Sequence, residues 1–138
     1  MSSFNISGLD GVIATLESHA DEKKLNAATN HMLNAGAKIM RQEMQQAMKE
    51  AKLKDSGDMI KSVKSGGIKY DKNGEKYVEV RPRGYDRKGN PNNLKARIAE
   101  FGNSKRPARP WLSKAENKGF PKVQERMQEI FDEHMNKE

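Results

Sequence analysis

One carboxylate stands apart in a strongly basic stretch of the chain. Glu100 is the only acidic residue between Asp86 and Glu116, and arginines lie on both sides of it in the sequence. A carboxylate beside arginines can act as a general base, so Glu100 and Arg109 could serve a small nuclease-like enzyme. The same carboxylate could instead form a salt bridge or cap the end of a helix, and we favour this structural role.

The remaining residues that could do chemistry do not form a recognisable site. His19, His31 and His134 have no partner at metal-ligand spacing. The 71–75 stretch, DKNGE, lacks the later acidic ligand of a calcium loop, so a turn is the better interpretation. The chain has no cysteine and no glycine-rich phosphate loop. We therefore expect no catalytic, metal or cofactor-binding residues and no enzymatic activity.

Nucleic-acid binding is an alternative function class, because basic and aromatic residues alternate in the middle of the chain. The net charge is +7. Basic side chains neutralise phosphates and aromatic rings stack on bases. A basic surface that faces water or an acidic partner would have the same composition. The basic residues are Arg81, Arg83, Arg87, Lys88, Arg97, Lys105, Arg106 and Arg109, interleaved with Tyr85, Phe101 and Trp111.

The composition predicts one small domain. The chain has 138 residues, of which 34% are hydrophobic and 33% charged, so the core should be small. The start of the chain does not resemble a signal peptide, and no stretch has the length of a membrane span. We therefore expect a single domain over 1–138 with no membrane partner.

Helices are predicted at the N-terminal side of the chain. Residues 8–19 have apolar side chains on one face and should form a short amphipathic helix. Residues 24–51 lack proline and are rich in good helix formers, so they should form a long helix. This long helix has two apolar stripes, the second with Met40 and Met44. The second stripe could pack on the protein's own core, which we favour, or on a neighbouring subunit.

Strands and a loop are predicted in the middle. Residues 55–62 should form a short helical turn. Residues 67–81 alternate around a DKNG turn, which is typical of a β-hairpin. Residues 82–93 contain two prolines, two glycines and three asparagines and are predicted to be a flexible loop. Residues 94–101 can form a strand or a short helix, and their short apolar alternation favours a third strand.

The C-terminal part should be helical, in two pieces. Residues 111–118 suit a few helical turns that Gly119 ends, and a second amphipathic helix should start at Pro121 and run to 136. The expected fold class is α+β, with a long N-terminal helix and a C-terminal helix packed on a small antiparallel sheet of about three strands.

Two short motifs resemble those of phage tail-completion proteins, also described as head–tail joining or putative tail-component proteins of long-tailed phages and prophages. DSGDMIKS at 55–62 resembles the first motif, and IAEFGNSKRPARPWLSKA at 98–115 resembles the second. Asn103 stands where the family usually has threonine, and Trp111 stands where it usually has phenylalanine. The matching residues are Gly57, Met59, Ser62, Glu100, Phe101, Gly102, Ala108, Arg109, Pro110, Leu112 and Ala115.

The resemblance implies a structural role at the neck of the virion. Such a protein would form a homo-oligomeric ring that contacts the tail-tube protein, the head connector protein or both, after assembly in the host cytoplasm. It could also touch DNA in the neck. The family is not known for a catalytic site, so the resemblance implies none here.

Within the second motif we expect an anchor with a basic rim. Gly102 should permit a turn that a side chain would resist, and Trp111 and Leu112 should bury apolar area at the start of a helix. Pro107 and Pro110 should hold the residues before them, Arg106 and Arg109, extended. The residues that could face a partner are Arg83, Tyr85, Arg87, Lys105, Arg106 and Arg109, with Met40 and Met44 on the long helix.

Overall fold

The computed structural model describes residues 4–5, 22–53 and 56–136. The helices are α2 (Glu22–Glu50), α3 (Ser56–Ser62), α4 (Asn92–Phe101) and α5 (Leu112–Asn136). The strands are β1 (Phe4–Asn5), β2 (Val63–Ser65), β3 (Lys69–Tyr70), β4 (Lys76–Tyr77) and β5 (Glu79–Pro82). The helix expected at 8–19 lies outside the described residues. The predicted α+β class, with long helices and a small antiparallel sheet, is confirmed.

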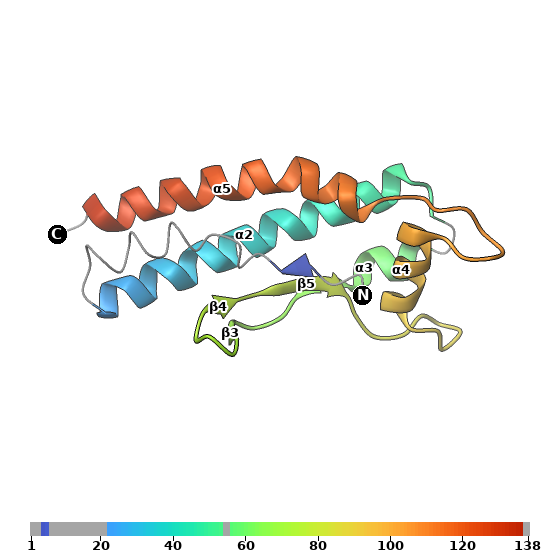
Figure 1. The fold of residues 1–138 in the computed structure, drawn as a ribbon, viewed down its shortest axis with the longest axis horizontal. Helices are drawn as coiled ribbons and strands as arrows, with labels where there is room; N and C mark the ends of the chain where they lie inside the picture. The colour runs from blue at the N-terminus through green and yellow to red at the C-terminus, as the bar shows by residue number, and fades with distance from the viewer. Residues whose placement is uncertain (1–3, 6–21, 54–55, 137–138) are drawn as a thin grey trace.

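An antiparallel pair of long helices dominates the molecule, with α5 lying along α2 for most of its length (Figure 1). The contact between Nδ1 of His31 and Nε2 of His134, 3.2 Å apart, joins the first half of α2 to the end of α5. Further along the seam, Lys122 pairs with Glu43. The other side of α2 contacts β2 and β5, so α2 lies between α5 and the sheet.

The core is rich in methionine, and α2 supplies most of the buried methionines. Met40 and Met44 are fully buried. The second stripe of the long helix therefore packs within the subunit, and the alternative placement of these two residues on a neighbouring subunit is wrong. The reason is that α5 covers this side of α2 with its own apolar residues, which are Leu112, Ala115, Val123, Met127 and Ile130.

The main sheet is antiparallel and has the strand order β1-β5-β2. Val80 in the central strand pairs with Phe4 on one side and with Ser65 on the other. Val80 and Pro82 are both buried, which fits the alternation of a strand with one covered face. The strand β2 was not expected from the sequence, because only Val63 of its three residues is apolar and buried.

A two-stranded ribbon, β3 and β4, extends from the sheet beneath α2 (Figure 1). Its turn is built on Asp71, whose Oδ1 accepts hydrogen bonds from the backbone N–H groups of Asn73 and Glu75 at 2.8 and 2.9 Å. Gly74 has a φ of 81° there. The predicted turn is confirmed, and so is the pairing at the tip of the predicted hairpin. Residues 79–81 of its second arm belong instead to β5, which pairs with β1 and β2.

The predicted third strand at 94–101 is wrong, because these residues belong to the helix α4. The buried residues of α4 are Asn92, Ala96 and Glu100, one per helical turn. Two of these three are polar, which hid the helical period from a search for apolar residues. The strand interpretation followed Leu94 instead, but this side chain is 51% exposed.

The predicted break in the C-terminal helix is also wrong, because α5 continues through Gly119 and Pro121. A proline inside a helix removes one backbone hydrogen bond and costs stability. Gly119 is buried against α2, where its lack of a side chain leaves room for Met40. Burial of the apolar face of α5 along α2 outweighs the local preference of both residues to end a helix.

Substitution of Gly119 by alanine tests this close contact. In an exposed helix, glycine to alanine stabilises by about 1 kcal/mol. A Cβ at 119 would instead overlap Sδ of Met40, so we expect Gly119→Ala to lower the free energy of unfolding by about 1–3 kcal/mol in urea denaturation. Gly57→Ala in α3 is the control, because its added Cβ meets nothing within 4 Å. A gain in stability at 119 would contradict the packing described.

Candidate functional site

Nearly all the residues that the sequence singled out lie at one end of the molecule, where α3, α4, the 82–91 loop and the 102–111 segment meet (Figure 1). The first motif, at 55–62, contributes α3. The second motif, at 98–115, contributes the end of α4, the connecting segment and the start of α5. The fold therefore brings the two motifs to a common end, although residues 63–97 separate them in the chain.

Glu100 caps the start of α5 from the neighbouring helix α4. Its Oε2 accepts hydrogen bonds from the backbone N–H groups of Trp111 and Leu112, both at 2.7 Å. Its Oε1 accepts from the Ser113 hydroxyl at 3.1 Å and from the Ser113 backbone at 3.4 Å. A negative charge at a helix N-terminus is favourable, because the free N–H groups carry partial positive charge. The structural role expected for Glu100 is confirmed as that of a helix cap.

Trp111 anchors the junction between the two helices. Its side chain is fully buried, and its Nε1–H donates to the backbone carbonyl of Ala96 at 2.8 Å. Leu112 beside it is also buried. The anchor predicted from the sequence is confirmed. Because its ring is enclosed, Trp111 is not available to stack on a nucleic-acid base.

The segment between α4 and α5 makes a tight turn at Gly102. Gly102 has a φ of 74°, and a Cβ there would lie 2.7 Å from the backbone nitrogen of Ala108. Oδ1 of Asn103 then accepts hydrogen bonds from the backbone N–H groups of Lys105 and Arg106, both at 2.9 Å. The need for glycine at 102 is confirmed, and Asn103 stabilises the loop through its neighbours' backbone.

Residues of the first motif also have structural roles, in the core and within α3. Met59 is buried, and the Ser62 hydroxyl donates to the Met59 carbonyl at 2.6 Å within α3. Gly57 is exposed, and the space around it is open. Pro110 and Phe101 of the second motif are exposed, the latter to 66%. The motif residues thus divide into buried anchors and an exposed remainder.

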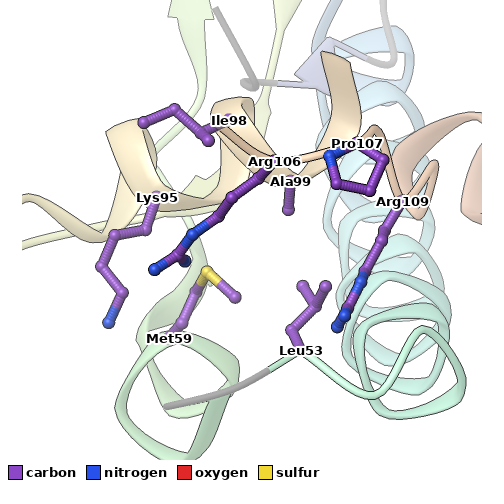
Figure 2. A pocket seen from close by; sticks show the side chains of 8 residues that line it. All are labelled: Leu53, Met59, Lys95, Ile98, Ala99, Arg106, Pro107 and Arg109. Atoms are coloured by element: carbon purple, nitrogen blue, oxygen red, sulfur yellow. The ribbon is translucent and has the colours of Figure 1, made fainter. Parts of the chain in front are cut away.

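Several hollows open at this end of the molecule, and two of them contain most of the residues expected to face a partner. The first, which we call the basic hollow, has a volume of about 310 Å³. It has cationic and apolar lining residues and no acidic one. Figure 2 shows the three cationic side chains arranged around Met59 and Leu53. The eight lining residues are Leu53, Met59, Lys95, Ile98, Ala99, Arg106, Pro107 and Arg109.

The second hollow, of about 460 Å³, is lined by residues of α3 and of the 82–93 loop, among them Arg83, Tyr85 and Arg87. Here the charges are partly paired: Arg87 lies 3.3 Å from Asp58. Arg83 donates to backbone carbonyls of Lys64 and Glu79. Tyr85 is 72% exposed.

The residues expected to face a partner are therefore split between two surfaces. Arg106 and Arg109 line the basic hollow, whereas Arg83, Tyr85 and Arg87 line the second one. Lys105 is exposed on the connecting segment but lines neither hollow. The sequence did not indicate Lys95 or Leu53, because their place beside Arg106 depends on the fold.

The 82–93 loop is organised around one buried carboxylate. The side chain of Asp86 is 7% exposed, and its Oδ2 accepts from Nζ of Lys95 at 2.8 Å. Its Oδ1 accepts from the backbone N–H groups of Lys88 and Asn90, both at 2.9 Å. Asn92 at the end of the loop is buried and donates to the Arg83 carbonyl. The flexibility expected for this loop stays a prediction, for which amide hydrogen exchange is the measurement.

The carboxylate of Asp86 should make the loop sensitive to acid. The hydrogen bond from Lys95, followed by those from the backbone of Asn90 and Lys88, lowers the pKa of Asp86 from 3.8 to about 2. Because the pKa is lower in the folded state, the ionised carboxylate stabilises the fold at pH values above the pKa of the unfolded state. This stabilisation is lost as the pH falls through the pKa of the folded state. We expect amide exchange at Lys88 and Asn90 to accelerate between about pH 4 and pH 2, relative to the intrinsic rate.

The variant Asp86→Asn is the matched control for that titration. It keeps the size of the side chain but has no carboxylate to protonate. Its exchange at Lys88 and Asn90 should be faster than in the parent protein at pH 5 and should lack the additional step below pH 4. An acid step of equal size in both proteins would show that another group controls the loop.

Within residues 22–53 and 56–136, no group of three histidine, aspartate or glutamate side chains is placed to hold a metal ion. The pairing of His31 with His134 could not be expected from the sequence, because only the packing of α5 on α2 brings these residues together. None of the helices described is both long and apolar enough to cross a membrane.

The chain matches the model of a known protein family. The family model described as "Bacteriophage HK97-gp10, putative tail-component" matches residues 10–102, which is more than half of the chain. No curated protein and no solved structure matches the chain. The matched range includes α2, α3, the strands β2 to β5 and α4 and ends at the glycine of the tight turn.

Proposed function

Because the chain belongs to the HK97-gp10-like family of bacteriophage tail components, we propose that it completes the tail and joins it to the head at the neck of a long-tailed phage or prophage. The family match over residues 10–102 is the observation that carries the proposal. The matched range extends from the long helix α2 to the end of α4. It therefore includes the residues of α3 and α4 that line the two hollows.

The chemistry of the motif residues supports a structural role. A general base needs a carboxylate oxygen that can reach a substrate. Both oxygens of Glu100 accept hydrogen bonds at the start of α5, and only 9% of the residue is exposed. Glu100 is thus used to hold two helices together, which favours an assembly protein over the nuclease-like alternative.

We further propose that copies of the protein form a ring and contact the tail-tube protein, the head connector protein or both. Rings use different patches on the two sides of each subunit. The second hollow, with its mixed charges, supports one such contact between copies, whereas the apolar and basic character of the first suits a contact with a different virion protein. Met40 and Met44 are excluded from these patches by their burial.

Contact with DNA is a second candidate, and one observation favours it. Tyr85 and Phe101 are 72% and 66% exposed at the end of the molecule that carries the arginines. Exposed aromatic rings among cations can stack on bases. Affinity for duplex or single-stranded DNA should then fall steeply with added salt. An absence of binding at low salt would reject this candidate.

Electron microscopy of virions assembled without the protein tests the main proposal. We expect filled heads and separate or aberrant tails, and expect a supplied copy of the gene to restore joined particles. Complementation with Glu100→Gln should also restore joining if that variant folds. Normal joined virions in the absence of the protein would overturn the proposal, whatever ligand the hollows bind.

A further inference from the structure

The basic hollow carries positive charge that the subunit does not neutralise. Arg106 is exposed, and no acceptor for its guanidinium lies within hydrogen-bonding distance among the described residues. Nη1 of Arg109 donates a hydrogen bond to the backbone carbonyl of Lys52 at 3.0 Å. Because this acceptor is uncharged, the positive charge of Arg109 is not neutralised. Lys95 is the exception, because Asp86 pairs with it from outside the hollow.

The surface beneath these charges is apolar. Met59 and Leu53 are buried, and Ile98 and Ala99 are half-buried. Figure 2 shows Met59 beside Arg106, Leu53 beside Arg109 and Ala99 between the two arginines, whereas Ile98 lies at the upper edge of the view. A site of this kind holds a ligand by apolar burial and orients it with a few charged donors. A ligand that fits must therefore have an apolar part and an anionic part close together.

The apolar surface continues outward along α4. Leu94, Ile98 and Phe101 follow one another at spacings of four and three residues, so they share one face of the helix. Leu94 and Phe101 are 51% and 66% exposed, while the opposite face of α4 buries Ala96 and Glu100. An extended or helical segment of a partner could therefore occupy the hollow and this face together.

From this placement we propose that the basic hollow binds an acidic segment of another virion protein, in which a glutamate or aspartate lies next to a large apolar side chain. The carboxylate pairs with Arg106 and Arg109, and the apolar side chain packs on Met59, Leu53 and Ile98. Charge-assisted pairs of arginine with carboxylate are strong and directional. The identity of the partner as a virion protein rests on the proposed function.

A second copy of this chain fits the hollow less well. Three acidic side chains near the end of α5 already have partners within the subunit: Glu129 and Glu133 lie near Arg126, and Asp132 accepts from Gln128. A DNA strand would supply anionic phosphates but no aliphatic side chain for the apolar floor. An acidic protein segment satisfies both parts of the hollow.

Peptide binding to the full chain tests the proposal. The probe is an acetylated, amidated hexapeptide of alternating leucine and glutamate, titrated into the ¹⁵N-labelled protein. We expect the amide signals of Ile98 and Ala99 to shift. The same peptide with glutamine in place of glutamate, and one with serine in place of leucine, should each bind at least about tenfold more weakly, because each lacks one of the two contacts.

Two matched variants locate the site. Arg106→Gln should weaken binding of the leucine–glutamate peptide about tenfold or more, since a charged hydrogen bond is lost. Arg97→Gln removes the same charge from an exposed residue of α4 that does not line the hollow, and it should leave the affinity unchanged within twofold. Both side chains are exposed, so neither variant should disturb folding.

Four results would overturn the proposal. The first two are the absence of a shift at Ile98 and Ala99 and an equal affinity for the peptide with glutamine in place of glutamate. The third is an equal loss of peptide affinity in Arg106→Gln and Arg97→Gln. The fourth is displacement of the peptide by a DNA duplex that shifts the same amide signals. In virions, Arg106→Gln should reduce head–tail joining while Arg97→Gln should not. If deletion of the gene blocks joining but Arg106→Gln does not, the proposed function stands and the role of the hollow fails.

Discussion

Trp111→Ala should lower the free energy of unfolding by about 3–5 kcal/mol, as large-to-small substitutions of buried aromatic residues do. The side chain is fully buried, and it connects α4 to the start of α5. Its removal leaves a cavity and also leaves the carbonyl of Ala96 without its indole donor. Because Trp111 is the only tryptophan, unfolding in urea should be followed by far-ultraviolet circular dichroism.

Trp111→Phe separates the two contributions to this loss. The phenyl ring retains much of the apolar burial but cannot donate to Ala96, so we expect a loss of about 1–2 kcal/mol. A loss below about 1 kcal/mol for Trp111→Ala would mean that the residue is a surface contact with a partner and that the junction is held by other groups.

Glu100→Ala should be about as destabilising as Trp111→Ala. It removes the acceptor from the backbone N–H groups of Trp111, Leu112 and Ser113 at the start of α5. A buried donor that loses its acceptor costs about 1–3 kcal/mol, so a total loss of about 3–5 kcal/mol is expected. The same urea denaturation measures it, here with tryptophan fluorescence as a second signal.

Glu116→Gln is the control for the removal of a carboxylate near this junction. Burial, and then the charge of Glu100, raise the pKa of Glu116. A raised pKa means that the ionised carboxylate is disfavoured in the folded state. Glu116→Gln should therefore maintain or increase the free energy of unfolding at pH 7, and should change it little at pH values below the pKa of the unfolded state. If Glu100→Ala is as harmless as this control, the cap is not important for stability.

Several elements could be predicted because their signals are local. The helix α2 lacks proline and is rich in alanine, methionine and glutamine, and the β3–β4 turn has an aspartate that accepts backbone hydrogen bonds and a glycine with a positive φ. The anchoring role of Trp111 was predictable for a similar reason, since a lone tryptophan in a hydrophilic chain is usually buried. In each case a short stretch of sequence contains the physical cause.

The two errors at the level of elements have a common physical origin. In α4, two of the three buried positions are polar: the side-chain amide of Asn92 donates to the Arg83 carbonyl, and Glu100 accepts from the start of α5. Both partners lie outside the helix. In α5, Gly119 and Pro121 oppose a helix locally, but packing on α2 maintains it. In both helices, tertiary contacts outweigh the secondary-structure preference of the local sequence. A pattern within a short stretch of sequence does not reveal such contacts.

The candidate site could be predicted only in part. Arg106 and Arg109 were identified as basic residues that face a partner, but the apolar floor beneath them was not. That floor is built from Leu53 after α2, Met59 in α3 and Ile98 in α4, which approach one another only in the folded chain. The chemistry of a hollow lined by several elements depends on their arrangement, which composition does not contain.

The length of α5 bears on how the protein can be divided for experiments. The family match ends at residue 102, ten residues before α5 begins, yet α5 is what covers the methionines of α2. A fragment ending at the match would expose this methionine-rich face to water and should aggregate. The boundary of sequence similarity is therefore not a boundary of the folding unit, and fragments for expression should extend through the last turn of α5.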